Sequence, residues 1–303
     1  MLKDFFTLEV GQKFHSQEEL IKHLSASKDL RNVEYLPSTL KPDNNKNYIK
    51  IRDTKFTNVS FSKTVFERVF FFNCNFIDCL FIGVEVRNCE FHNCSFKCVN
   101  TFKMKIKDTY VNPSIFIHCF DCKNRTEISN IAVSLFQQLL ENSKRQNQKN
   151  FTRLSQYYFE RWQDRLLWNK YKNKKPYKIS CGTFIKKMPW RIIYRYTLGY
   201  GLRLRNLLIT FLFIFVIFLF INYTFWDSYV IILKDVSKLE FYNDSICTIL
   251  TSFFYTFDVT TKLIDSQLQP TSLNGMVLFV IQGVLGFIFL SGLMTVLINR
   301  FVK

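Results

Sequence analysis

The sequence has few of the residues that perform most enzyme chemistry. It contains only four histidines, His15, His23, His92 and His118. None of them lies in a pattern that pairs a base with a nucleophile, and no glycine-rich phosphate loop occurs. We therefore do not expect an enzyme, and no cofactor is implied.

Acidic residues are also scarce. The chain of 303 residues has 41 Lys and Arg against 24 Asp and Glu, which gives a formal charge of +17. A charge of this size suggests nucleic acid, an anionic membrane surface or an acidic partner. The position of the charge along the chain has to decide among these partners.

The N-terminus lacks the apolar segment of a secretory signal. Residues 1–13 contain no such run, so we expect no cleavable signal peptide. The body of the chain should then be cytosolic, where thiols are kept reduced. Reduced thiols are accordingly the expectation for the nine cysteines.

A five-residue period runs through the first third of the chain. Thirteen of fourteen positions in one row are apolar: Ile51, Phe56, Phe61, Phe66, Phe71, Phe76, Phe81, Val86, Phe91, Phe96, Thr101, Ile106, Val111 and Phe116. Two residues before these positions lies a row of smaller side chains: Thr54, Val59, Thr64, Val69, Cys74, Cys79, Val84, Cys89 and Cys94. The residues between the two rows are mostly polar.

This period fits neither an α-helix nor a simple strand, but it fits a solenoid in which each short unit forms one side of a coil. The double row resembles that of pentapeptide-repeat proteins over residues 49–116. The resemblance implies a right-handed quadrilateral β-helix with four units per coil and about three and a half coils. We place the β-helix at 49–122, with an N-terminal cap at 1–48.

The cysteines of the second row are interpreted as fillers of the coil. Their spacing does not match the close ligand pairs of zinc sites. Cys119 and Cys122 have zinc-like spacing beside His118, but a second ligand pair is missing. The end of the coil is therefore preferred to a metal site there.

The capping and connecting segments are predicted to be helical. A short helix is expected near 16–24, with Ser16 as its N-cap, followed by a polar linker at 42–47. Two apolar series at helical spacing predict helix over 126–170. Residues 123–206 form a basic cytoplasmic connector, because they carry 19 Lys or Arg and four Asp or Glu.

The end of this connector combines cations with aromatic residues, as membrane-interface segments do. The residues concerned are Lys186, Lys187, Trp190, Arg191, Tyr194, Arg195, Tyr196, Tyr200, Arg203 and Arg205. Anionic lipid headgroups are the expected partner. Nucleic acid is the weaker alternative, because an apolar segment long enough to span a membrane follows directly.

Two long apolar segments, at about 207–226 and 276–298, each suffice to cross about 30 Å of hydrocarbon. Basic residues precede the first span and follow the second, so the positive-inside rule places both termini in the cytoplasm of a multi-pass inner-membrane protein. The loop at 227–275 has three Lys and six Asp or Glu and should lie outside.

The stretch from Ser245 to Phe257 is apolar but too short to span, so a re-entrant segment is expected at about 245–265. With Thr260 and Thr261, it resembles the pore helix and filter entrance of two-transmembrane potassium-channel-like proteins. The segments from Tyr157 to Arg161 and from Leu198 to Leu202 resemble motifs of bacterial pentapeptide-repeat proteins with such a pore. The Gly-Tyr-Gly of a potassium filter is absent after the threonines. The Gly-Tyr-Gly at 199–201 precedes the first span and is interpreted as a turn.

The resulting hypothesis is a homotetrameric ion channel with a pore domain at 207–303, cation-conducting and poorly selective for potassium over sodium. The resemblance implies a pore and filter formed by Asp258, Thr260, Thr261, Lys262, Leu263 and Asp265. It also implies hinges of the inner helix at Gly283, Gly286 and Gly292. The ten basic residues of 49–116 argue against the DNA-mimicking role known among pentapeptide-repeat proteins. The alternatives are a membrane-anchored scaffold, whose β-helix binds an unknown ligand or protein, and a membrane-disrupting defence effector.

Overall fold

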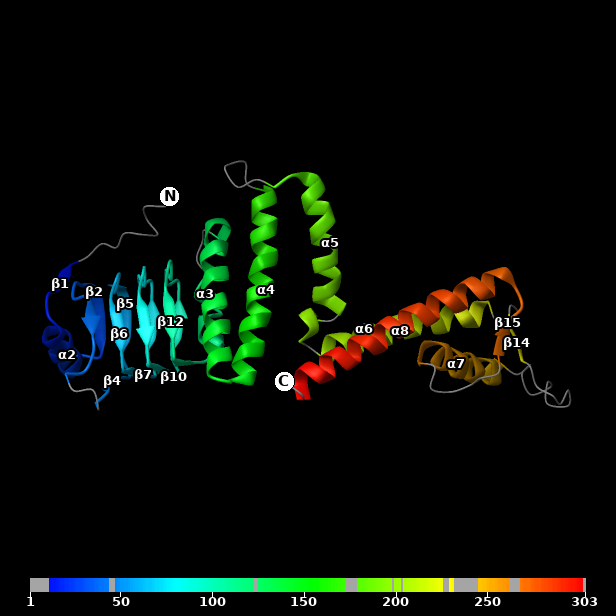
Figure 1. Ribbon diagram of the computed structural model, residues 1–303, viewed down its shortest axis with the longest axis horizontal. Helices are drawn as coiled ribbons and strands as arrows, with labels where there is room; N and C mark the ends of the chain where they lie inside the picture. The colour runs from blue at the N-terminus through cyan, green and yellow to red at the C-terminus, as the bar shows by residue number, and fades with distance from the viewer. Residues whose placement is uncertain are drawn as a thin grey trace. The chain divides into compact units, whose positions relative to one another are not determined.

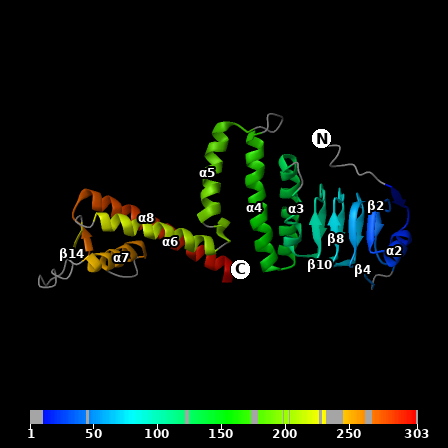
Figure 2. The same ribbon diagram turned by 180° about the vertical axis from the view of Figure 1, so that it is seen from behind.

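The computed structural model describes residues 11–43, 47–121, 125–172, 179–197, 199–202, 204–225, 229–231, 245–261 and 268–301. The chain divides into two compact units, Met1–Met188 and Pro189–Lys303. Figures 1 and 2 show the stacked parallel strands in the first unit and the long apolar helices in the second. The two units are described separately.

The N-terminal unit is built on three parallel sheets. The first sheet has the order β1 (Gln12–Phe14), β2 (Asp29–Tyr35), β5 (Lys55–Ser60), β8 (Asn75–Ile77), β11 (Ser95–Lys97). The second has the order β13 (Tyr110–Val111), β10 (Glu90–His92), β7 (Val69–Phe72), β4 (Ile49–Arg52). The third has the order β12 (Lys105–Lys107), β9 (Glu85–Arg87), β6 (Val65–Glu67), β3 (Thr39–Leu40).

Each strand pairs with the strand one coil further along the chain. Ile51 pairs with Phe71, and Phe71 pairs with Phe91. The offset of 20 residues corresponds to four five-residue units in each turn of the coil. The prediction of a parallel β-solenoid from the five-residue period is therefore confirmed.

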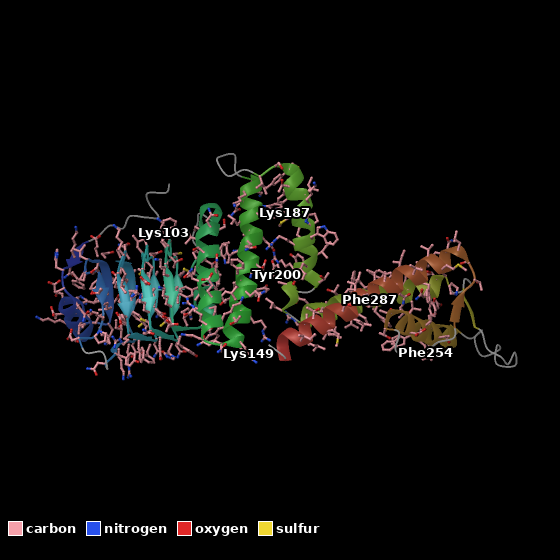
Figure 3. The ribbon with its side chains drawn as sticks, viewed as in Figure 1. Lys103, Lys149, Lys187, Tyr200, Phe254 and Phe287 are labelled. Atoms are coloured by element: carbon pink, nitrogen blue, oxygen red, sulfur yellow. The ribbon has the colours of Figure 1, made fainter. Side chains whose placement is uncertain are left out.

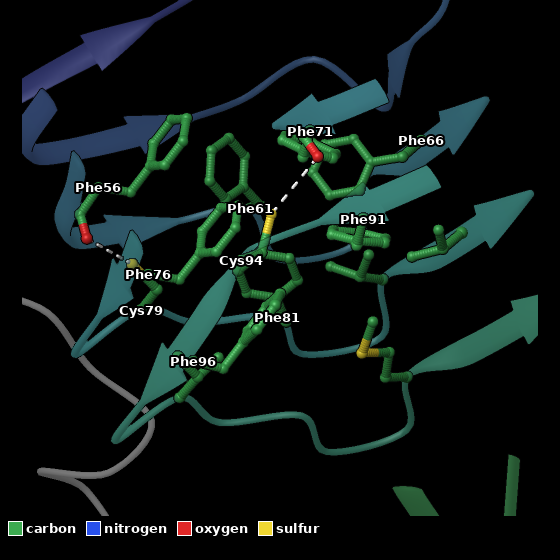
Figure 4. Close-up of a cluster of buried hydrophobic side chains, with 14 of the residues drawn as sticks. Phe56, Phe61, Phe66, Phe71, Phe76, Cys79, Phe81, Phe91, Cys94 and Phe96 are labelled. Atoms are coloured by element: carbon green, nitrogen blue, oxygen red, sulfur yellow. Dashed lines mark hydrogen bonds between the residues drawn. The ribbon is translucent and has the colours of Figure 1, made fainter. Parts of the chain in front are cut away.

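The predicted phenylalanine row forms the core of the solenoid. All fourteen residues of the row, Ile51 to Phe116, are at most 5% exposed. Their rings stack between coils: the centroid of Phe76 lies 4.8 Å from that of Phe56 and 4.6 Å from that of Phe96. Figure 4 shows these rings packed inside the coils. Stacking of like residues in register explains why Phe recurs at this position.

A second regularity occurs at the corners of the coil. Every fifth residue from Asp53 to Asp108 has a positive φ, between 48° and 67°. Eight of these twelve residues are Asn, Asp or Gly, the residues that adopt this conformation at least cost. The chain thus bends once in each five-residue repeat, and the next strand begins in a new direction.

The smaller residues of the second row are buried beside the rings. The Cys79 thiol donates hydrogen bonds to the carbonyls of Phe56, at 3.5 Å, and Ile77, at 3.3 Å. Thr109, at the equivalent position of a later coil, donates to Val86 and Lys107 in the same way. Cysteine therefore fills the position as a hydrogen-bonding residue of threonine size. Burial raises the pKa of both Cys79 and Cys89 to about 12.

The solenoid extends further toward the N-terminus than the repeat predicts. Strands β1, β2 and β3 lie within 1–48, the segment expected to be a separate cap, and they pair in parallel with the coils. The short helix predicted near 16–24 is present as α2 (Gln17–Ala26), which follows β1. As predicted, Ser16 is its N-cap, and the Ser16 hydroxyl accepts a hydrogen bond from the Glu19 amide at 3.2 Å. Residues 44–46 of the expected linker lie outside the described residues.

The other end of the solenoid is covered by helix α3 (Arg125–Arg145), which packs against α4 (Lys149–Lys172). A short 3-10 helix, η1 (Pro113–Phe116), comes between the last strand and α3. The buried Asn142 amide accepts a hydrogen bond from the Thr109 amide at 3.1 Å and donates one to the Thr109 carbonyl at 2.7 Å. This side chain satisfies backbone groups that a further coil would otherwise bind.

Helix α5 (Cys181–Thr197) crosses the division between the units, and a 3-10 turn, η2 (Gly199–Gly201), follows it. The C-terminal unit contains α6 (Leu204–Thr224), α7 (Ser245–Thr261) and α8 (Leu273–Phe301), which pack against one another. Strands β14 (Tyr229–Ile231) and β15 (Leu268–Pro270) pair antiparallel. The helices match the two predicted apolar segments and the predicted short segment between them.

Candidate functional site

Two helices of the C-terminal unit, α6 and α8, are long and apolar enough to cross a membrane. Only 17% of either candidate span is buried within the chain. Phe287 on α8 is 72% exposed and Phe254 on α7 is 41% exposed (Figure 3). The C-terminal helices therefore expose a broad apolar surface, which is typical of helices in contact with lipid.

Several polar side chains of this unit lie on the inside. Seven polar or charged residues are at most 7% exposed: Asn222, Ser252, Thr256, Asp258, Thr260, Thr261 and Gln282. Water-soluble proteins bury apolar groups and expose polar ones, so this distribution is the reverse of theirs. Polar residues between packed helices and apolar residues outside are the arrangement expected in a bilayer.

Four of these residues form one hydrogen-bonded network where the three helices meet. The Asn222 amide of α6 donates to Thr256 Oγ1 at 2.9 Å and to Gln282 Oε1 at 3.0 Å. The Gln282 amide of α8 donates to the Thr256 carbonyl and to Thr260 Oγ1, both at 2.9 Å. The network therefore fixes α7 against both apolar helices through buried hydrogen bonds.

The threonines can serve this network because of their spacing on α7. Thr256 and Thr260 are four residues apart and lie on the same side of the helix. Each hydroxyl donates to the carbonyl four residues earlier, at 2.6 Å. Their oxygens then remain as acceptors for the two amides.

The backbones of α7 and α8 approach closely at Gly286. A Cβ atom built on Gly286 would lie 2.0 Å from the carbonyl oxygen of Thr260. Nothing lies within 4 Å of a Cβ built on Gly283. Gly286 thus has a packing role that its neighbour one turn earlier does not share, and small residues allow such contacts between membrane helices.

The sequence-predicted pore residues gather at the end of α7 where the structure describes them. Asp258, Thr260 and Thr261 are 5–7% exposed, and the Thr260 side chain faces Gln282 of the same chain. Lys262, Leu263 and Asp265 lie outside the described residues. Gly292 lies within α8 with Gly283 and Gly286, so all three predicted hinge glycines belong to one helix.

The Gly-Tyr-Gly segment forms the turn that the sequence predicts before the first apolar helix. Gly199, Tyr200 and Gly201 all have positive φ angles, of 53°, 61° and 72°. Tyr200 is only 3% exposed and its ring packs edge-on against Tyr194. Tyr200 is therefore buried rather than part of the exposed aromatic surface that was expected before the span.

Neither Gln282 nor its partner Asn222 was predicted from the sequence to be a functional residue. The available signal was the occurrence of one uncharged amide in each apolar span. An amide in such a segment needs a hydrogen-bond partner, and the amide of the other span is a natural one. Thr260 and Thr261 were predicted to face a pore, and the contact of Thr260 with Gln282 could not be read from the chain.

No known family model matches this chain, and no curated protein matches it.

Proposed function

We propose that this protein is an oligomeric membrane channel that conducts cations and is regulated by its N-terminal solenoid. The single observation that carries the proposal is α7, a short helix between two candidate membrane spans, bound to both by the buried amide network. In this proposal α7 is re-entrant, and four copies of the chain surround one pore. The solenoid is a right-handed coil with a four-sided cross-section.

The end of α7 supplies the groups that a cation would meet. A helix C-terminus offers partial negative charge, and Asp258 and Thr261 lie in its last turn. The following residues Lys262, Leu263 and Asp265 complete the filter, which lacks the Gly-Tyr-Gly of potassium channels. The pore should therefore prefer cations and distinguish poorly between potassium and sodium.

Helix α5 supports the membrane assignment. None of its residues is buried, and Trp190 and Tyr196 are 73% and 63% exposed. They alternate with Lys186, Lys187 and Arg191 just before the first apolar helix. We assign α5 to the surface of an anionic inner-membrane leaflet, with both termini cytoplasmic and Gly283, Gly286 and Gly292 as positions where α8 bends.

A membrane-anchored scaffold is the second candidate. The burial of Asp258, Thr260 and Thr261 within one chain favours it, because groups engaged inside the unit are not offered to an ion. In this alternative the solenoid binds a partner and the three helices only hold it at the membrane. A defence effector that disrupts membranes remains a hypothesis from the sequence and has no separate structural support.

Electrical recording separates these functions. The purified full-length chain is reconstituted into planar bilayers with asymmetric potassium and sodium chloride. A channel should give currents whose reversal potentials show cation preference with little difference between the two cations. Asp258→Asn and Asp265→Asn should each lower that preference, because each removes negative charge beside the proposed filter.

The matched control is Asp78→Asn, which removes the same charge from a corner of the solenoid and should leave the reversal potential unchanged. Chemical cross-linking of the same purified chain in lipid vesicles should give four linked copies. Strong potassium selectivity would contradict the proposed filter. Complete absence of current from a correctly inserted chain would favour the scaffold.

A further inference from the structure

A cavity of about 350 Å³ lies on the outer side of the second sheet, where the solenoid meets the turn between α3 and α4. It is lined by Tyr48, Phe70, Asn88, Cys89, Glu90, Asp108, Tyr110, Gln146 and Gln148. All nine lining residues lie between positions 48 and 148, so the cavity belongs entirely to the N-terminal unit, whose strands and helices are seen in Figure 1. Its volume is at the lower end of the range for small-molecule sites.

The charge of the cavity is opposite to that of the chain. Among the described residues, two carboxylates line it, those of Glu90 and Asp108, and no Lys or Arg does. The chain as a whole carries +17. Glu90 contacts His92 through one oxygen, at 2.7 Å, and the Asp108 carboxylate has no hydrogen-bond or ion-pair partner among the described residues.

Three basic residues that neighbour the lining residues in the sequence have partners elsewhere. Arg87 and Lys107, which precede lining residues in the sequence, both pair with Glu85, at 2.8 and 3.5 Å. Arg145, which precedes Gln146, donates to the Ile106 carbonyl at 3.4 Å. The negative charge of the cavity is therefore not neutralised by these basic neighbours.

Aromatic rings form the walls. Tyr48 stacks on Phe70 with 4.2 Å between ring centroids and remains 47% exposed. Tyr110 is 39% exposed and is held between His92, at 5.0 Å, and Phe151, at 5.6 Å. Exposed aromatic rings attract cations electrostatically, more strongly when a carboxylate is near.

The two glutamines of the α3–α4 turn add an independent sign of a missing donor. The Oε1 atoms of Gln146 and Gln148 are buried, and neither has a hydrogen-bond partner in the described part of the chain. A buried acceptor without a donor is unfavourable. Both glutamines line the cavity, so a ligand that brings several N–H groups would meet their side chains as well as the carboxylates.

We propose that this cavity binds a small organic cation that carries a guanidinium or primary ammonium group. The carboxylates of Glu90 and Asp108 accept charge-assisted hydrogen bonds from its N–H groups, and Tyr48 and Tyr110 cover its aliphatic part. A metal ion fits less well, because the described residues contain no group of three or more His, Cys, Asp or Glu that could hold one. The site does not depend on the channel proposal.

Binding is measured by calorimetry on the full-length chain in detergent micelles. The probes are agmatine and 1,4-diaminobutane, with tetramethylammonium as a cation without N–H groups and 1,4-butanediol as a neutral compound. Agmatine or the diamine should bind saturably with one site per chain, and the other two probes should bind at least about tenfold more weakly. N-acetyl-arginine amide tests whether the same group can be supplied by a peptide.

Glu90→Gln and Asp108→Asn should each weaken binding about tenfold or more, and Tyr110→Leu should weaken it without any change in charge. Asp78→Asn is the matched control, since Asp78 occupies an equivalent corner with φ of 53°, against 48° for Asp108. It should leave affinity unchanged. Absence of saturable binding by agmatine and the diamine, or equal weakening by Asp78→Asn, would overturn the proposal. Tighter binding of the arginine amide than of agmatine would identify a peptide as the source of the cation.

Discussion

The two units of this chain place polar and apolar side chains in opposite ways. In the solenoid, the inward positions hold rings such as Phe76, and the corners hold mainly Asn and Asp. In the α6–α7–α8 unit, the inward positions include Asn222 and Gln282, and the outward positions include Phe254 and Phe287.

The contrast indicates two solvents. A solenoid in water gains stability by removing apolar rings from the solvent. Helices in hydrocarbon gain nothing from removing apolar groups, and their contacts come from close approach and buried hydrogen bonds. Gly286 and the amide network provide these two kinds of contact in the C-terminal unit.

The largest expected effect comes from emptying the solenoid core. Phe76→Ala should destabilise the N-terminal unit by about 3–5 kcal/mol, because it leaves a cavity between the rings of Phe56 and Phe96. Thermal unfolding of the chain checks this. Phe72→Ala is the matched control on the outer face of the same coil and should cost less than half as much. Equal effects of the two substitutions would contradict the assigned direction of the side chains.

The opposite polarity of the helical unit predicts a second effect. Phe287→Lys should disfavour membrane insertion of α8 by about 2.5–3.5 kcal/mol if that face meets lipid. The fraction of the chain that resists alkaline extraction from membranes measures it. Phe102→Lys, on the exposed surface of the solenoid, should change this fraction little and stability by no more than about 0.5 kcal/mol. A well-folded, water-soluble Phe287→Lys variant would break the comparison.

Two glycines of α8 offer a smaller but sharper test. Gly286→Ala should destabilise the C-terminal unit by about 1–3 kcal/mol, because the new methyl group meets the Thr260 carbonyl. Gly283→Ala meets nothing and should stabilise the helix by up to about 1 kcal/mol. Unfolding in detergent micelles compares them. Destabilisation by both would show that the two positions do not differ in packing.

The smallest effect near neutral pH concerns the buried thiols, whose contribution changes only in alkaline solution. Burial raises the pKa of Cys79 from its ordinary value of 9.0 to about 12 in the folded chain. Between pH 9 and 12 the unfolded thiol loses its proton while the folded thiol keeps it, so its contribution to stability falls as pH rises, by at most about 1.4 kcal/mol per pH unit. Cys79→Thr should remove this part of the pH dependence. Cys181→Ser, at an exposed cysteine, serves as the control and should not.

The solenoid could be predicted in detail because its information is local and repeated. The row that contains Phe76 and the row that contains Cys79 each repeat one position of the five-residue unit. The period therefore predicts which side chains of these units point into the coil. The N-terminal coils escaped prediction, since β1, β2 and β3 are separated by α2 and by irregular spacing. Their pairing depends on the coil already formed by β5 and β6.

In the C-terminal unit, the sequence alone determined the two apolar spans and the short helix between them, because length and hydrophobicity are sufficient to specify such helices. Only the tertiary structure decided that Asn222, Gln282 and the α7 threonines share one network, and that Gly286 rather than Gly283 touches α7. The tertiary structure also brought Glu90, Asp108 and the glutamines of the α3–α4 turn around one cavity. These residues lie 18 to 60 positions apart in the sequence. The packing of helices and coils determines which of them become neighbours, and a local sequence pattern does not contain that information.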